Sequence, residues 1–210
     1  MNQQIDTIIF DLGGVLIDWN PAYVFNKTIP DEEERKYFFE QVCTHDWNEE
    51  QDAGKLLQIA TEERVKLFPE WETHIRSFYG RWEEMLGDAI AGTVHVFNRL
   101  REMSDLKMYA LTNWSHETFP VALERYEFLH RFDGILVSGE EKTRKPFPEI
   151  YQLLFTRFNI NPERAVFIDD NLRNIKAGEV FGLKVVHFKS PEQLTDELIK
   201  LGILQKNQDR

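Results

Sequence analysis

One stretch near the start of the chain constrains the fold more than any other: residues 8–18, which read IIFDLGGVLID. The apolar run at residues 8–10 predicts a short buried strand. An acid follows at once, and the two glycines after it let the backbone turn sharply and approach a ligand closely. Open α/β sheets bind their ligands in the crevice beyond the carboxyl ends of the strands. We therefore predict that Asp11 is a nucleophile.

From residue 89 onward, short apolar runs alternate with amphipathic stretches. The pattern predicts strands over 106–111, 134–138, 165–168 and 184–188, and helices over 93–103, 115–126, 148–158 and 171–181, with a last helix opening at residues 190–193. Strands that alternate with helices are typical of parallel sheets covered on both faces. The expected class is therefore α/β, with a Rossmann-like, mostly parallel sheet and helices on both faces.

Residues 18–88 lack this alternation and predict helices near 31–43, 55–67 and 70–86. The third of these carries one apolar face, formed by Trp71, Ile75, Phe78, Trp82 and Leu86. Because this block departs from the exit loop of the first strand, it should lie over the strand ends. We predict a core domain built from residues 1–17 and 89–210, and an inserted helical cap domain at residues 18–88.

The charge of the chain excludes some classes of partner. There are 25 Lys and Arg residues against 36 Asp and Glu residues, a formal net charge of −11. An acidic surface repels nucleic acid and anionic lipid, so neither is an expected partner. A small phosphorylated metabolite remains compatible with the sequence where cations gather locally. Nothing in the sequence fixes the oligomeric state.

Cysteine usage and hydropathy bear on the compartment. Cys43 is the single cysteine, which excludes an intramolecular disulfide and predicts a buried, inert thiol in a reducing cytoplasm. No apolar stretch approaches the roughly 18 residues of a membrane span, and residues 1–6 lack the pattern of a signal peptide. We expect a soluble cytoplasmic protein.

Polar side chains recur at the predicted strand ends or in the loops just beyond them: Asp11, Thr112 with Asn113, Lys145, and Asp169 with Asp170. Taken singly, each suits a turn, a helix cap or a solvated loop. The paired acids differ, because two adjacent carboxylates near a buried crevice are costly unless a cation neutralises them. In a parallel sheet these strand ends meet at one edge, so the four features should share one crevice.

Together these features resemble the four motifs of the haloacid dehalogenase-like hydrolase superfamily. Residues 10–16 are similar to the first motif, 111–113 to the second, 145–151 to the third, and 167–171 to the fourth. The helical block resembles the cap that this family inserts after its first motif. The likeness is greatest to sugar-phosphate phosphatases and to the phosphatase domain of epoxide hydrolases, which also carry asparagines near the acid pair, as Asn171 and Asn174 do here.

The resemblance implies a role for each motif in phosphomonoester hydrolysis. Asp11 would attack phosphorus and form an aspartyl-phosphate that water hydrolyses. Mg²⁺ would be held by Asp11, Asp170 and the backbone carbonyl of Gly13, with Asp169 behind them or as an alternative ligand. Lys145 would balance the negative charge, and Thr112 would bind phosphate oxygens.

Gly13 departs from the family pattern. Phosphatases of this family usually carry there a second aspartate that serves as general acid and base, a role that contributes about 10²–10⁴-fold to rate. The sequence therefore predicts slow turnover of poor leaving groups. Four residues are candidates to replace the missing acid, although each also suits a structural or surface role: Asp18, His45, Asp52 and His116.

Four further residues are candidates for contact with the substrate or its phosphate group. Asn113 and Trp114 follow Thr112 and are candidates for substrate contact, as is Trp47 in a predicted cap loop. Arg144 could assist phosphate binding or simply be solvated.

Two other functions stay open at this point. The first is metal-independent 2-haloacid dehalogenation, in which Asp11 attacks carbon; family dehalogenases also lack the second acid, but they generally lack the acid pair at the fourth motif. The second is a weakly catalytic binding or regulatory protein with the same fold. Its only support in the sequence is Gly13, which replaces the usual general acid.

Overall fold

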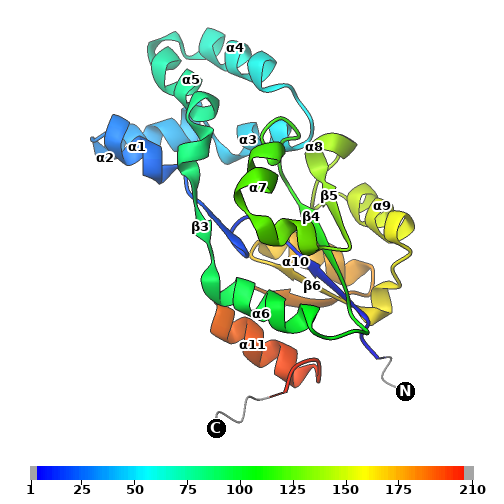
Figure 1. The fold of residues 1–210 in the computed structure, drawn as a ribbon. Helices are drawn as coiled ribbons and strands as arrows, with labels where there is room; N and C mark the ends of the chain where they lie inside the picture. Colours follow the sequence, from blue (N-terminus) through cyan, green and yellow to red (C-terminus); the bar gives the residue numbers. More distant parts are fainter. Residues whose placement is uncertain (1–3, 206–210) are drawn as a thin grey trace.

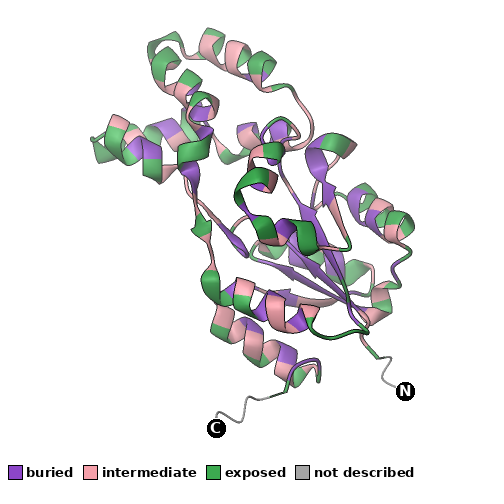
Figure 2. Cartoon of the chain, viewed as in Figure 1, coloured by how far each residue is buried: buried purple, intermediate pink, exposed green. Residues whose placement is uncertain are grey.

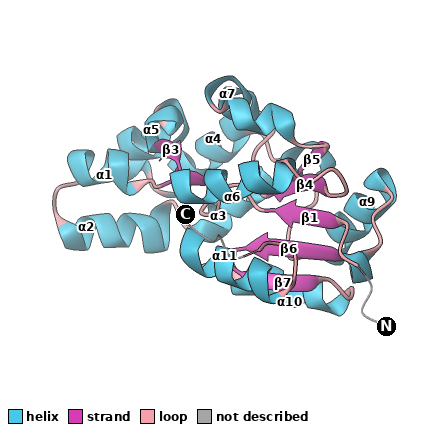
Figure 3. Ribbon diagram, turned by 60° about the horizontal axis from the view of Figure 1, so that its bottom comes forward, coloured by secondary structure: helices cyan, strands magenta, loops and turns pink. Residues whose placement is uncertain are grey.

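The computed structural model describes residues 4–205; residues 1–3, part of the stretch inspected for a signal peptide, lie outside it. Its centre is a five-stranded sheet in the order β5-β4-β1-β6-β7, in which every neighbouring pair is parallel (Figures 1 and 3). The strands are β1 (Thr7–Phe10), β4 (Lys107–Thr112), β5 (Gly134–Val137), β6 (Ala165–Asp169) and β7 (Lys184–His187). This is the parallel α/β sheet that the alternating sequence predicts.

Alternation along β1 sends side chains into two apolar layers. Ile8 and Phe10 enter one cluster, while Ile9 enters the other, because successive side chains of a strand point to opposite faces. Helices that contribute buried side chains to the first layer are α6 (Ala91–Arg101), α7 (Phe119–Arg125) and α11 (Pro191–Lys200). Those of the second layer are α9 (Pro148–Phe158) and α10 (Leu172–Val180). Burial of the sheet between these helices is visible in Figure 2.

A third apolar cluster lies in the helical block. The cap helices are α1 (Ala22–Thr28), α2 (Glu32–Tyr37), α3 (His45–Asp52), α4 (Leu57–Leu67) and α5 (Glu72–Gly80), with a π-helical turn at Phe38–Val42. Their buried core includes Phe25, Phe38 and Phe78. Trp19 and Tyr79 pack against both this cluster and the first layer of the sheet. The cap helices therefore form a layer with its own core, set against the carboxyl ends of the strands (Figure 1).

The chain enters and leaves the cap helices through a two-stranded ribbon. Strand β2 (Ile17–Trp19) pairs antiparallel with β3 (Leu86–Ala89), and Ile17 lies opposite Ala89. The helix expected near 70–86 is wrong in its last part: α5 ends at Gly80, and a 3₁₀ segment (Trp82–Met85) leads into β3. The strand that pairs with β3 is nearly 70 residues away in sequence. The helical spacing of apolar residues near 70–86 therefore predicted a helix where the chain forms the start of a strand.

Cys43 is buried in the core of the cap helices, as predicted, and burial raises the pKa of its thiol. Within residues 4–205, none of the helices combines the length and the apolar character that crossing a membrane requires.

Candidate active site

Three neighbouring strands deliver the candidate residues to one edge of the sheet. Strand β1 lies between β4 and β6, and all three run parallel, so Asp11, Thr112 and Asp169 emerge side by side. Lys145 reaches the same edge from the loop before α9. Its Nζ lies 2.9 Å from Asp11 Oδ2 and 2.7 Å from Asp169 Oδ2. The predicted convergence of these distant segments is therefore observed.

Lys145 is a buried cation between two carboxylates, with no exposed surface. Burial by itself would lower the pKa of Lys145, but Asp11 and Asp169 outweigh that effect and raise it. Burial also raises the pKa of Asp11 well above its usual range, although Lys145 opposes the shift. A single lysine does not balance the carboxylates gathered here, and the site therefore suits a further cation.

Asp169 has a supporting place in this cluster. Both of its oxygens accept hydrogen bonds from the Asn174 side chain, at 3.1 Å each, and Oδ1 also accepts from the Asn171 backbone N–H at 2.8 Å. With Lys145 on Oδ2, its hydrogen-bonding capacity is largely used. Asp169 therefore fixes the lysine, and Asp11 and Asp170 are freer to bind a metal.

Asn113 has a similar supporting place. Its side-chain Nδ2 donates to the Lys145 carbonyl at 2.9 Å, and its Oδ1 accepts from the Lys145 N–H at 2.8 Å. Although Asn113 borders the cavity, its amide group is used to hold the backbone of Lys145. Two asparagines, one behind Asp169 and one behind Lys145, thus position the charged groups.

The acidic residues form a cluster that could hold a metal ion. One oxygen from each of Asp11, Asp169 and Asp170 lies within 4.8 Å of the others. Gly14 has a φ of +73°, and a Cβ built on it would lie 2.5 Å from Asp170 Oδ2. A side chain at residue 14 would therefore displace this carboxylate, whereas a Cβ at Gly13 would meet nothing within 4 Å. The two glycines of the first motif have different structural requirements.

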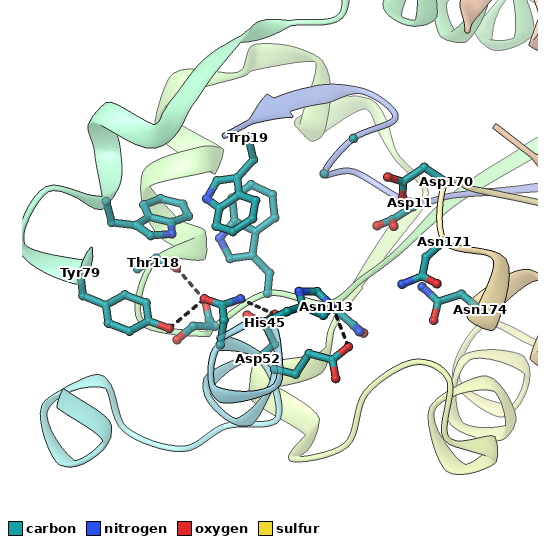
Figure 4. A pocket seen from close by; sticks show the side chains of 17 residues that line it. Asp11, Trp19, His45, Asp52, Tyr79, Asn113, Thr118, Asp170, Asn171 and Asn174 are labelled. Carbon is teal, nitrogen blue, oxygen red and sulfur yellow. Dashed lines mark hydrogen bonds and ion pairs between the residues drawn. The ribbon is translucent and has the colours of Figure 1, made fainter. Parts of the chain in front are cut away.

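A cavity of about 240 Å³ opens above this cluster. The core contributes Asp11, Gly13, Gly14 and Asp170 to its lining, and the cap helices contribute His45, Asn48, Glu49, Asp52 and Tyr79. Figure 4 shows Asp11 and Asp170 at one end and Tyr79 and Thr118 at the other, with His45 and Asp52 along the side between them. The reactive groups of the core thus face a cavity whose other side is lined by the cap helices together with Trp114, Ser115 and Thr118 of the core.

Three tryptophans add apolar surface to this cavity: Trp19, Trp82 and Trp114. Trp114 was a predicted contact residue; it is 6% exposed, and its Nε1 has no hydrogen-bond partner within residues 4–205. Trp82 packs edge-on against it at a centroid distance of 5.5 Å. The sequence predicts only a core role for Trp82, because it lies on an apolar helical face. The structure shows that Trp82 also borders the cavity.

Trp47 does not lie in the cavity lining, contrary to the expectation from the sequence. It is 3% exposed and packs edge-on against Phe78, with the Arg64 guanidinium 5.5 Å from its ring centroid. The indole belongs to the core of the cap helices, since α3 turns this face toward α5 and the opposite face toward the cavity. We therefore do not propose that Trp47 contacts substrate.

Glu49 links the cap helices to the core. It is 4% exposed, and its carboxylate lies 2.8 Å from Arg144 and 2.7 Å from Arg173. Arg144 thus has a carboxylate partner, which disfavours the expectation that it binds phosphate. His45, at 3.2 Å, completes the group. The importance of Glu49 was missed, because a glutamate in a charged helix carries no sequence signal for burial.

A parallel sheet with a strand-end carboxylate, a buried lysine and an acidic pair beneath a helical layer defines a Rossmann-like α/β enzyme. The family model for haloacid dehalogenase-like hydrolases matches residues 5–182. The chain therefore belongs to that hydrolase family, as the four motifs predicted.

Similar proteins include phosphatases that match most of the chain. A sesquiterpene phosphatase, astK of Aspergillus oryzae, is 26% identical over 90% of this chain and 90% of its own length. A phosphorylated carbohydrates phosphatase of Thermotoga maritima is 23% identical over 87% of this chain and 84% of its own. Among solved structures, a HAD family enzyme of Bacteroides thetaiotaomicron in complex with magnesium and inorganic phosphate superposes with a TM-score of 0.66, at 20% identity over 89% of this chain and 95% of its own. The structural likeness shows the fold.

Proposed function

We propose that this protein is a Mg²⁺-dependent phosphomonoester hydrolase that acts through an aspartyl-phosphate on a small phosphorylated metabolite. The observation that carries the proposal is the arrangement of Asp11, which lies beside a fully buried lysine and within reach of Asp170 at the floor of one cavity. In this cytoplasmic enzyme, residues 1–17 and 89–210 form the catalytic core and residues 18–88 form the cap domain.

The residues present fit a magnesium site. Asp11, Asp170 and the Gly13 carbonyl would be its protein ligands, a small set of hard oxygen donors that leaves room for water and phosphate oxygens. A bound Mg²⁺ supplies charge neutralisation of the phosphoryl group when substrate is present. This charge balance matters here because Lys145 is the one cation in direct contact with Asp11 among residues 4–205.

Each remaining group has a definite task in the proposed reaction. An Asp11 oxygen attacks phosphorus while the bond to the leaving oxygen breaks on the opposite side, and water then attacks the phosphorus of the aspartyl-phosphate and releases inorganic phosphate. Lys145 stabilises the charge on the transferring group. Thr112 is 1% exposed, and its Oγ1 has no partner within the described residues, so a phosphate oxygen would satisfy it.

The cavity favours a small leaving group. Pockets for drug-sized ligands span about 300–1,000 Å³, and this cavity is smaller at about 240 Å³. Tryptophan side chains beside Asn48 and Asp52 suit a molecule with both C–H surface and hydroxyl groups, such as a sugar phosphate. The T. maritima relative named for phosphorylated carbohydrates points the same way, whereas the A. oryzae relative is named for a sesquiterpene substrate.

Metal removal tests the proposed chemistry. In a screen of phosphorylated metabolites and 4-nitrophenyl phosphate with Mg²⁺, we expect hydrolysis that falls to background with EDTA and returns when Mg²⁺ is added, because the Asp11 and Asp170 charges are otherwise unbalanced. Phosphate release is the measurement. Halide release from 2-haloacids that survives EDTA would instead establish the dehalogenase. No phosphate release above an Asp11→Asn control would favour a binding or regulatory protein.

The Gly14→Ala substitution tests the metal site separately. The new Cβ would lie 2.5 Å from Asp170 Oδ2 on a backbone with φ of +73°, so the carboxylate must move. We expect the Mg²⁺ concentration for half-maximal activity to rise by about tenfold or more, since displaced metal-site groups typically cost about 10–100-fold in metal affinity. Calorimetric titration with Mg²⁺ gives the binding constant directly. Gly13→Ala is the matched control, because a Cβ there meets nothing within 4 Å; equal Mg²⁺ affinities for the two variants would contradict this site.

A further inference from the structure

Gly13 leaves the proposed reaction without a proton donor at the position where relatives of this family carry one. When Asp11 attacks phosphorus, the leaving oxygen departs in line on the far side of the phosphorus atom. In the cavity, that direction points away from Asp11 and Asp170 and toward the side where the titratable residues of the lining come from the cap helices (Figure 4). A proton donor for the leaving group should therefore be sought among these cap residues.

The positions of the four candidate residues show which of them can reach the leaving group. Asp18 accepts a hydrogen bond from the Tyr23 hydroxyl and borders a separate surface hollow. His116 is absent from the cavity lining. His45 lines the cavity, but its Nε2 lies 3.2 Å from Glu49 and 3.3 Å from Arg173. Asp52 lines the cavity and is not part of that charged group.

The structure holds Asp52 in a fixed place beside the loop that follows Thr112. It is the last residue of α3, and its carbonyl accepts a 2.5 Å hydrogen bond from Ser138 Oγ. The same Ser138 Oγ accepts from the Trp114 N–H at 2.9 Å, which connects Asp52 to the loop after Thr112. One serine thus links the end of α3 to the residue that follows the second motif.

The Asp52 side chain is directed by α3 itself. Its Oδ2 accepts a hydrogen bond from Asn48 Nδ2 at 3.2 Å, and Tyr79 donates from its hydroxyl to Asn48 Oδ1 at 3.0 Å. The other carboxyl oxygen, Oδ1, has no partner in the part of the chain that the structure describes. Asn48, Asp52 and Tyr79 all line the cavity, so this free oxygen is available to a bound substrate.

We infer that Asp52, on the cap side of the cavity, is the general acid and base that replaces the acid missing at Gly13. The inference rests on the proposed phosphatase function and adds a catalytic residue to it. The ligand that Asp52 serves is the leaving oxygen of the phosphomonoester, at the end of the substrate that faces the cap helices.

The proton and the bonds balance over the two steps. In the first, Asp11 forms a bond to phosphorus, the bond to the leaving oxygen breaks, and the Asp52 carboxylic acid gives its proton to that oxygen, so an alcohol leaves. In the second, the Asp52 carboxylate takes a proton from the water that attacks phosphorus. Phosphate leaves, and both the Asp11 carboxylate and the Asp52 acid are restored.

The electrostatic surroundings suit this task. Burial raises the pKa of Asp52 to about 7, and the Glu49 carboxylate adds to the shift. His45, Arg144 and Lys145 act in the opposite direction, and Tyr79 faces the group from α5 as a neutral phenol whose own pKa is raised by burial and by Asp52. A carboxyl group that titrates near neutral pH can both give and take a proton during turnover.

Two aryl phosphates with different leaving groups test the role. Phenolate is a poor leaving group, with a parent pKa near 10, as for tyrosine, and it needs a proton; 4-nitrophenolate is a better one and needs it less. For Asp52→Asn, we expect kcat/KM on phenyl phosphate to fall about 10²-fold or more, with little change on 4-nitrophenyl phosphate. Slow hydrolysis of the aspartyl-phosphate should also produce a burst of 4-nitrophenolate close to one per active site.

The controls separate this role from a structural one. Asp46→Asn makes the same change at an exposed residue of α3 and should leave both substrates unaffected. Adding Gly13→Asp to Asp52→Asn should restore hydrolysis of phenyl phosphate, because a Cβ at residue 13 meets nothing within 4 Å and an acid there takes the usual family position. Equal losses on both substrates, or no loss on phenyl phosphate, would overturn the role of Asp52.

The unmodified protein provides a second test that needs no folded variant. Because the acid form of Asp52 is required, kcat/KM on phenyl phosphate should fall as the pH rises through about 7, with a much weaker fall on 4-nitrophenyl phosphate. Parallel profiles for the two substrates would also overturn the inference. Absence of Mg²⁺-dependent turnover of either substrate would instead refute the phosphatase function itself.

Discussion

Replacing Asp11 by asparagine should reduce kcat for 4-nitrophenyl phosphate by at least about 10⁴-fold, the scale on which enzymes lose activity when a nucleophile is removed. The amide keeps the shape of the side chain and can still accept the 2.7 Å hydrogen bond that Oδ1 receives from the Leu12 N–H. What it loses is the carboxylate that attacks phosphorus and binds the metal. Initial rates of 4-nitrophenolate release at saturating Mg²⁺ provide the measurement.

A folding check and a control variant separate loss of the nucleophile from loss of structure. Circular dichroism and thermal unfolding should show a folded Asp11→Asn variant, because Lys145 keeps its partner Asp169 at 2.7 Å. Asp18→Asn is a matched control, since Asp18 lies outside the cavity and should not affect turnover beyond about twofold. A folded Asp11→Asn variant with one hundredth or more of the original activity would contradict a nucleophilic role.

The second large effect should follow from removing the buried cation with Lys145→Met. Asp11 and Asp169 would then face each other in a buried site without their shared partner, and the removal of one member of a buried ion pair typically costs about 3–5 kcal/mol. We expect the free energy of unfolding, measured by urea denaturation in EDTA, to fall by that amount. We also expect phosphatase activity to be lost, because no cationic side chain among residues 4–205 then contacts Asp11 or stabilises the transferring phosphoryl group.

A double variant distinguishes charge from packing. If charge is the cause, Lys145→Met with Asp169→Asn should recover part of the lost stability, since one of the two unpaired carboxylates is gone, yet it should recover no activity. If the double variant is less stable than Lys145→Met alone, then the volume and the hydrogen bonds of the two side chains matter more than their charges, and the electrostatic account is wrong.

The core and its charged residues could be predicted from sequence because their signals are local. Short apolar runs that end in Asp11, Thr112 and Asp169 indicate both the strands and the place where each one ends. The parallel order of the strands then requires these ends to meet. Even the position of Lys145 followed, because its motif has a fixed place in the family pattern.

The cap side of the site could not be predicted in the same way. Trp47 and Asp52 belong to one helix, but whether a side chain faces the core of the cap helices or the cavity depends on how α3 rests on its neighbours, and no periodic signal reports that. The burial of Glu49 depends on Arg144 and Arg173, which lie 95 and 124 residues further along the chain. Strand β3 was missed for the same reason, since its pairing partner β2 is distant in sequence.

The paired strands β2 and β3 have a consequence for how such an enzyme can diversify. Both passages of the chain between the sheet and the helices run through this one ribbon, where Ile17 lies opposite Ala89, and Asp11, Thr112, Lys145 and Asp170 all lie outside the segment it encloses. Insertions, deletions or wholesale exchange of that segment therefore leave the nucleophile and the proposed metal ligands in place, provided that the incoming segment supplies an acid at the position of Asp52. Grafting a segment from a relative onto this ribbon offers a direct way to engineer a new preference for the alcohol half of the ester.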